Sequence, residues 1–142
     1  KTAWKLLSEV IRGEAADHGG NVLCYTCGVM GVRGYGIQAG HAIGGRDGAV
    51  LLDEEIIRPQ CVRCNIFLRG NYPVFTTKLI REKANILRQA GPLDYPFYAA
   101  DALNWWEAKL AASRNVHKWD RISLQAKINE YRERLARLAT GA

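Results

Sequence analysis

The sequence predicts an α+β domain, with a loop-rich core that carries paired cysteines and a mostly α-helical C-terminal half. All four cysteines lie between residues 21 and 75, in a segment rich in glycine and in short apolar runs. Apolar residues at helical spacing precede this segment and resume after it. We therefore divide the 142 residues into an N-terminal helix (1–20), a core (21–75) and a helical extension (76–142).

Apolar faces and end signals predict the first three helices. One amphipathic helix is expected over residues 4–16, before the core. After the core, Thr76 or Thr77 can cap a helix that ends at Gly91, which a proline follows. Asp101 can cap the next helix, whose apolar residues again recur at helical spacing.

A last helix is expected from about Asp120 to Ala139. Its apolar seam alternates in steps of four and three along Leu124, Ile128, Tyr131, Leu135 and Leu138. Such a seam packs on another helix, either of the same chain or of a second copy, although about two heptads are fewer than a coiled coil needs. Of these alternatives we favour the homodimer.

The chain carries a net charge of +6, and most of the positive excess lies in its second half. Residues 1–70 hold 8 Lys+Arg and 7 Asp+Glu, whereas residues 71–142 hold 12 and 7. A basic half is expected of a protein whose partner is a polyanion such as nucleic acid. No apolar run approaches the ~20 residues that span a bilayer, and nothing resembles a secretory signal. We therefore expect a soluble, cytoplasmic protein with no membrane partner.

The cysteines form two C-x-x-C pairs, Cys24 with Cys27 and Cys61 with Cys64. Two such pairs in a chain without a secretory signal predict one tetrahedral Zn²⁺ site. Four thiolates leave no coordination position for water, so the zinc is expected to be structural. Two disulfides are disfavoured in a reducing cytoplasm, and a redox-active pair lacks the surrounding thioredoxin-like βαβ pattern.

The residues between the pairs predict two short strands and a helix. Residues 36–44 suit one strand, and 50–52 with 56–57 suit a second. The sequence Asn65-Ile-Phe-Leu, after the second pair, can begin a helix. Strand, loop, strand and helix held together by zinc is the plan of a zinc-stapled ββα-metal core, the His-Me finger or HNH fold of nucleases.

The sequence also resembles a known family through four segments within residues 4–90. The segments are Cys24-Tyr-Thr-Cys-Gly, Gln38-Ala-Gly-His41, Arg58-Pro-Gln-Cys61-Val-Arg-Cys64-Asn65 and Gly70-Asn71. They resemble the NinG/Rap proteins of lambdoid phages, which are endonucleases that act on branched DNA. The order of pair, histidine, pair and asparagine is also similar to phage endonuclease VII, which resolves four-way junctions. The resemblance implies a phage- or prophage-encoded protein that acts in the bacterial host cytoplasm.

The resemblance assigns roles to individual residues. His41 matches the general base, and Asn65 matches the asparagine that binds the catalytic Mg²⁺ or Mn²⁺. Two positions depart from the pattern: Gly40 stands where endonuclease VII has an acidic metal ligand, and Ile56 stands where the NinG/Rap pattern commonly has asparagine. The acidic ligand must therefore come from elsewhere or be missing.

A carboxylate for the cation can come from Asp53, Asp47, Glu54 or Glu55. We choose Asp53, because it lies at the edge of the second predicted strand. Each assignment has a plainer alternative. His41 can be a structural strand residue, Asn65 can cap a helix, and Asp53 can be a solvated turn acid.

The predicted function is a metal-dependent endonuclease that hydrolyses phosphodiester bonds in branched DNA, such as Holliday junctions and other recombination intermediates. A base that deprotonates water and a cation that neutralises developing charge meet the needs of this reaction. The alternatives are an HNH enzyme that nicks duplex DNA and a non-catalytic zinc-knuckle module that binds DNA.

Overall fold

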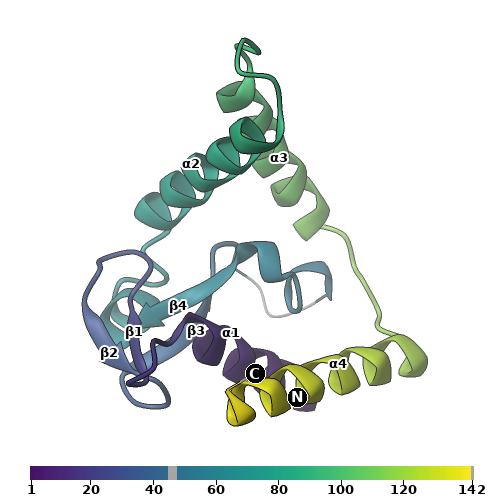
Figure 1. Cartoon of the computed structure of the whole chain (residues 1–142). Coiled ribbons are helices and arrows are strands. Elements are labelled where there is room, and N and C mark those ends of the chain that lie inside the picture. The colour runs from purple at the N-terminus through teal and green to yellow at the C-terminus, as the bar shows by residue number, and fades with distance from the viewer. Residues whose placement is uncertain (45–47, 142) are drawn as a thin grey trace.

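The computed structural model describes residues 1–44 and 48–141, and it has the predicted α+β composition. Four long helices surround two small antiparallel sheets (Figure 1). In chain order the elements are α1 (Thr2–Ala15), β1 (Asn21–Leu23), β2 (Met30–Val32), β3 (Ile37–His41), the 3-10 turns η1 (Gly48–Val50) and η2 (Glu54–Ile56), β4 (Ile57–Cys61), the short π-type helix η3 (Arg63–Phe67), α2 (Tyr72–Ala90), α3 (Tyr98–Ser113) and α4 (Arg121–Thr140).

The central sheet pairs β3 with β4 in an antiparallel register that runs from Ile37 opposite Cys61 to His41 opposite Ile57. The first strand confirms the prediction for residues 36–44. The prediction of a second strand at 50–52 was wrong, because Asp53 accepts a hydrogen bond from the Glu55 N–H and starts a 3-10 turn. The strand begins only after that turn and leads directly into the second cysteine pair.

The first sheet, β1 with β2, was not predicted. Its strands are three residues each, too short for an alternating pattern to be visible in the sequence. This hairpin carries the first cysteine pair in its loop. The helix expected at Asn65 is present as η3, but it is short. Left-handed conformations at Arg69, Gly70 and Asn71 turn the chain sharply into α2.

The C-terminal half has the three predicted helices, but two of them begin earlier than predicted. Helix α2 begins at Tyr72 rather than at Thr76 or Thr77, because Pro73 suits the first turn of a helix. Helix α3 begins at Tyr98 and places Asp101 in its first turn. The two helices pack together as a hairpin, beyond which a linker leads to α4 (Figure 1).

Helix α4 begins after Asp120, close to the predicted start, and the Asp120 carboxylate caps the helix by accepting the Ser123 N–H. Its apolar seam packs on α1 of the same chain. Tyr131 is fully buried in the core that also holds Leu7 and Val10. At Gly13 the helices are so close that a Cβ would lie 2.8 Å from Leu138 Cδ1. The seam therefore no longer supports a homodimer, which stays a prediction without this basis.

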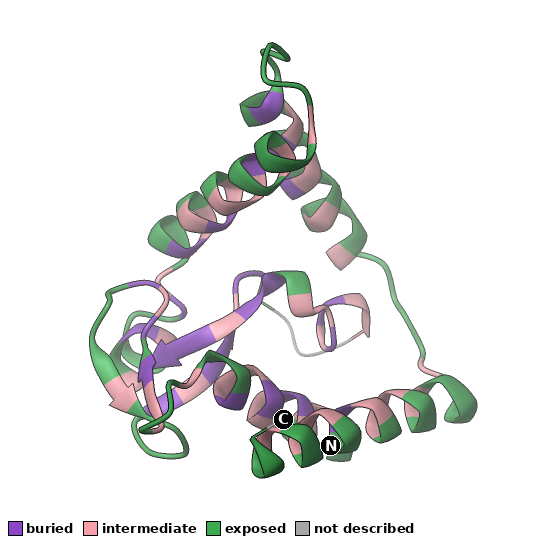
Figure 2. Cartoon of the chain, viewed as in Figure 1, coloured by how far each residue is buried: buried purple, intermediate pink, exposed green. Residues whose placement is uncertain are grey.

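Buried residues form two groups (Figure 2). The larger core unites α1, β3, β4, α2, α3 and α4, and the smaller one surrounds the cysteines with Val22 and Ile37. Within the described part of the chain, every helix lacks the length and apolar character needed to cross a bilayer.

Candidate functional site

The four cysteines form a cluster that can hold a structural zinc ion. Their sulfur atoms all lie within 4.8 Å of one another, and the Sγ atoms of Cys27 and Cys61 are 3.8 Å apart. Tetrahedral coordination with Zn–S bonds of ~2.3 Å requires sulfur atoms about 3.8 Å apart. The cluster thus has the ligand type, ligand number and spacing of a closed four-cysteine site.

Local backbone geometry presents each pair to the cluster. In the β1–β2 loop, the Gly28 N–H donates to the Cys24 carbonyl, and Gly28 adopts a φ of 77°. Glycine adopts this left-handed conformation without the steric cost that a Cβ would impose. In the second pair, the Cys64 N–H donates to Cys61 Sγ at 3.4 Å. Asn71 Nδ2 donates to Cys64 Sγ at 3.7 Å, so the turn before α2 also orients a ligand.

The electrostatics of the cluster favour a bound dication. Burial acts to raise the pKa of Cys24, but hydrogen bonds from Thr26 and from backbone N–H groups outweigh it and lower this pKa to about 6. Burial raises the pKa of Cys61 to about 12, and the neighbouring thiols add to that effect. The Cys24 thiolate therefore forms readily, whereas Cys61 keeps its proton until a cation displaces it.

A second constellation lies at Gly40, on the central sheet. An ideal Cβ built on Gly40 would be 3.0 Å from Asn65 Oδ1. Asn65 donates through Nδ2 to Gln38 Oε1 at 2.7 Å, which holds its amide across the sheet. The structure therefore brings Asn65 against the strand position that precedes His41. Side-chain contacts of Asn65 place it there, whereas the sequence alone linked Asn65 to His41 only by the family resemblance.

Gln60 is part of this constellation and was not singled out from the sequence. Its side chain is fully buried, and its Oε1 would clash with a Cβ at Gly40. The only sequence signal was a polar residue in a strand next to a cysteine. That signal is weak, because nothing in the sequence shows which residue it faces across the sheet.

His41 ends β3 and is half-buried. Its Nε2 lies 3.1 Å from the Leu51 carbonyl oxygen, and its ring lies 4.5 Å from the ring of Trp4, centroid to centroid. Because a carbonyl oxygen only accepts, Nε2 carries the proton of the neutral ring. The contact with Trp4 holds the ring in place.

The carboxylates proposed as cation ligands have other partners. Asp53 accepts from the Glu55 N–H and pairs with Lys109 Nζ at 2.7 Å. Glu54 pairs with Arg134, and Glu55 pairs with Lys109. A cation on Asp53 would have to replace the ammonium group of Lys109, so this ligand stays a prediction. Asp47 lies outside the described residues.

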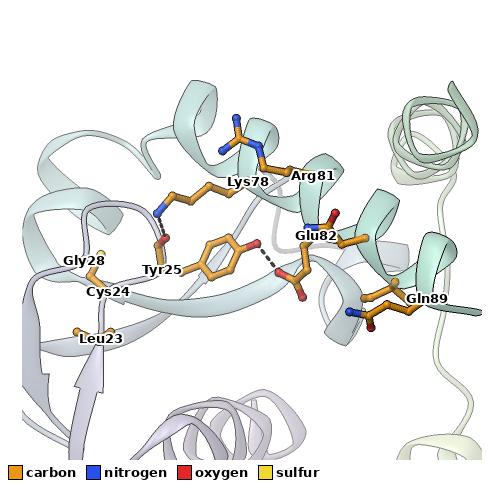
Figure 3. Close-up of a pocket in the computed structure, with 10 residues that line it drawn as sticks. Leu23, Cys24, Tyr25, Gly28, Lys78, Arg81, Glu82 and Gln89 are labelled. Atoms are coloured by element: carbon orange, nitrogen blue, oxygen red, sulfur yellow. Dashed lines mark hydrogen bonds between the residues drawn. The ribbon is translucent and has the colours of Figure 1, made fainter. Parts of the chain in front are cut away.

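A groove of about 620 Å³ lies between the first cysteine pair and α2 (Figure 3). Tyr25 projects into it and donates through its hydroxyl to Glu82, while Lys78 Nζ donates to the Tyr25 carbonyl at 2.9 Å. Burial and the Glu82 carboxylate raise the pKa of Tyr25. The exposed Arg81 lies on the same wall, so the groove offers cationic groups beside the cysteine cluster.

Comparisons with protein-family models, with curated proteins and with solved structures found no match to this chain. The resemblance to junction-cleaving nucleases therefore rests on the motif residues themselves.

Proposed function

We propose that this protein is a metal-dependent endonuclease that cleaves branched DNA, with a structural zinc ion in the four-cysteine cluster and a ββα-metal core formed by β3, β4 and η3. The observation that carries the proposal is the contact of Asn65 with Gly40, the residue before His41. A candidate cation ligand thus lies against the residue that precedes the candidate base in the strand. The strand order and the following helix agree with such a core.

The donor set at Gly40 fits a hard divalent cation. Asn65 Oδ1 is a neutral oxygen ligand of the type that Mg²⁺ and Mn²⁺ accept, and the buried Gln60 Oε1 also lies at the position that a side chain at residue 40 would fill. When bound there, the cation would neutralise charge that develops on the scissile phosphate. The phosphate would add the anionic oxygen that Gly40 cannot provide.

His41 would act as the general base that takes the proton of the attacking water. The Leu51 carbonyl, 3.1 Å from Nε2, helps to hold the imidazole ring in place. The products would carry 5′-phosphate and 3′-hydroxyl ends. The two basic residues of the groove, the half-buried Lys78 and the exposed Arg81, are candidates for backbone contacts with the DNA.

The test is cleavage of a labelled four-way junction by the parent, by His41→Ala and by a matched control, His117→Ala, which removes an exposed histidine. Loss of a general base typically costs about 10²–10⁴ in rate. We expect His41→Ala to keep its zinc, bind the junction as the parent does and barely cut it, while His117→Ala cuts normally. Near-parental cleavage by zinc-loaded His41→Ala would leave this histidine a structural role only.

A non-catalytic zinc-knuckle module that binds DNA is the second candidate. It is favoured by the absence of a side chain at Gly40 and by the engagement of Asp53 with Lys109. Among the described residues, the cysteines are also the only group of three or more His, Cys, Asp or Glu side chains placed to hold a metal. Junction binding without any cut in Mg²⁺ or Mn²⁺ would identify this module. Equal cutting of a junction and its linear arms would instead indicate a duplex-nicking HNH enzyme.

A further inference from the structure

The side-chain amide of Gln60 is held in one orientation. Its Nε2 donates to the Gly70 carbonyl at 2.8 Å and to Thr26 Oγ1 at 3.1 Å. A backbone carbonyl can only accept, so an exchanged amide would place two acceptors against each other. The nitrogen therefore faces Gly70, and Oε1 faces the opposite way, toward Gly40.

That oxygen is buried and has no hydrogen-bond partner among the described residues. An unpaired buried polar atom destabilises the folded state, so a native fold seldom keeps one without a ligand or a water molecule. Gln60 Oε1 overlaps the Cβ position of residue 40, and Asn65 Oδ1 lies 3.0 Å from the same point. Two amide oxygens thus converge on the space that a residue-40 side chain would occupy.

We infer that Gln60 Oε1 is a ligand of the divalent cation together with Asn65 Oδ1, in place of the acidic side chain that residue 40 lacks. Amide oxygens are hard ligands suited to Mg²⁺ and Mn²⁺. Gly40 is required because any Cβ there meets Gln60 Oε1. A site with two neutral protein ligands binds a free cation weakly and depends on the phosphate of bound DNA for charge. This inference rests on the proposed function, because it names a second ligand of the proposed cation site.

The test uses Mn²⁺ as a paramagnetic probe of the zinc-loaded full chain, followed by NMR. In the parent, low Mn²⁺ concentrations should broaden the side-chain amide signals of Asn65 and Gln60 before those of other amides. Gly40→Ala adds only the Cβ that displaces Gln60 Oε1, and Gln60→Ala removes the oxygen. Each should weaken the effect at Asn65 about tenfold or more. Gln125→Ala, which removes an exposed side-chain amide of α4, should behave as the parent does.

The swap variant Gly40→Asp with Gln60→Ala decides the question even if Gln60→Ala alone does not fold. It exchanges the two oxygen sources, so Mn²⁺ should broaden Asn65 at or below the concentration that the parent needs. Zinc content and the dispersion of the spectrum report folding for every variant. If the parent shows no localised broadening, the cation site fails together with the inference. If Gly40→Ala and Gln60→Ala respond as the parent does, or the swap does not respond, only the role of Gln60 is refuted.

Discussion

Cys27 and Cys61 contribute equally to a four-cysteine zinc site but unequally to packing, and this difference makes their serine variants a sharp test of the metal. Cys27 is exposed, whereas Cys61 is buried in the smaller core. If the cysteines only pack, Cys27→Ser should be neutral, and Cys61→Ser should cost about 1–3 kcal/mol for burying a hydroxyl. If zinc holds the fold, the two substitutions should be equally severe.

The size of the effect follows from the closed site. Binding of a structural zinc is worth about 10–16 kcal/mol near neutral pH, whereas a whole domain is stable by about 5–15 kcal/mol. The smaller core contains few apolar residues besides the cysteines, so it cannot compensate for a lost thiolate. We therefore expect both variants to lose zinc and to unfold at least the β1–β2 hairpin and the second cysteine pair.

Zinc content, thermal melting and hydrogen exchange measure these effects separately. Exchange should become fast in residues 21–32 and 57–71 in both variants, and the melting temperature should fall by a similar amount in each. Retention of zinc and an unchanged melting curve in Cys27→Ser, with a loss of stability in Cys61→Ser alone, would show that these cysteines pack and hold no metal.

Three further predictions concern the helical half and its charges. Arg134 forms bidentate ion pairs with Glu14 and lies half-buried, so Arg134→Met should lower the melting temperature by about 3 °C, or about 1 kcal/mol. Because the hydrogen bond from Arg134 lowers the pKa of Glu14, this contribution is present above the unfolded pKa of Glu14. It is lost as the pH falls through the folded pKa, so parent and variant should converge in acid melting curves. Tyr131→Phe should leave the melting temperature unchanged or raise it, since the buried hydroxyl has no partner among the described residues; a clear loss would reveal one. If α4 contacts DNA phosphates, alanine at the exposed Arg121 or Arg132 should reduce the salt dependence of junction binding by about 0.9 in the log–log slope for each residue, measured by titration at several salt concentrations. An unchanged slope would place the DNA on another face.

Local signals were enough to predict the cysteine cluster, the strand that ends at His41 and the helices α1 and α4. Each depends on spacing within a short segment: two residues between paired cysteines, or apolar residues three and four apart. The predicted start of α2 was wrong because the sequence offers two local start signals. Thr76 and Thr77 precede an apolar run and suit a cap, whereas Pro73 suits the first turn of a helix. Local chemistry allowed both starts, and the chain uses the earlier one.

The rest depended on partners far away in the sequence. Asp53, predicted as a cation ligand, pairs with Lys109 on α3, a partner that local sequence could not reveal. The apolar seam of α4 suited packing on a second copy of the chain as well as on the same chain, and in the structure it packs on α1. The role proposed for Gln60 depends on Gly40, on the neighbouring strand, which has no Cβ at the point where Gln60 Oε1 lies. Such pairings are set by the whole fold, so no periodicity or motif could reveal them.

The positions of Gln60 and Asn65 connect the cysteine cluster with the proposed cation site. Gln60 directly precedes Cys61, and Asn65 directly follows Cys64, so each amide is one peptide bond from a predicted zinc ligand. A closed site of four thiolates has no open position for substrate, yet it can fix the backbone on both sides of the knuckle. Cation ligands must be held within about 0.5 Å to be effective, and two short segments with few apolar contacts cannot achieve this alone. The zinc would then contribute to catalysis only by holding these two amides in place. Its loss should remove the response of Asn65 to Mn²⁺ even where α1 and α4 still share their core, because that core is built from other residues.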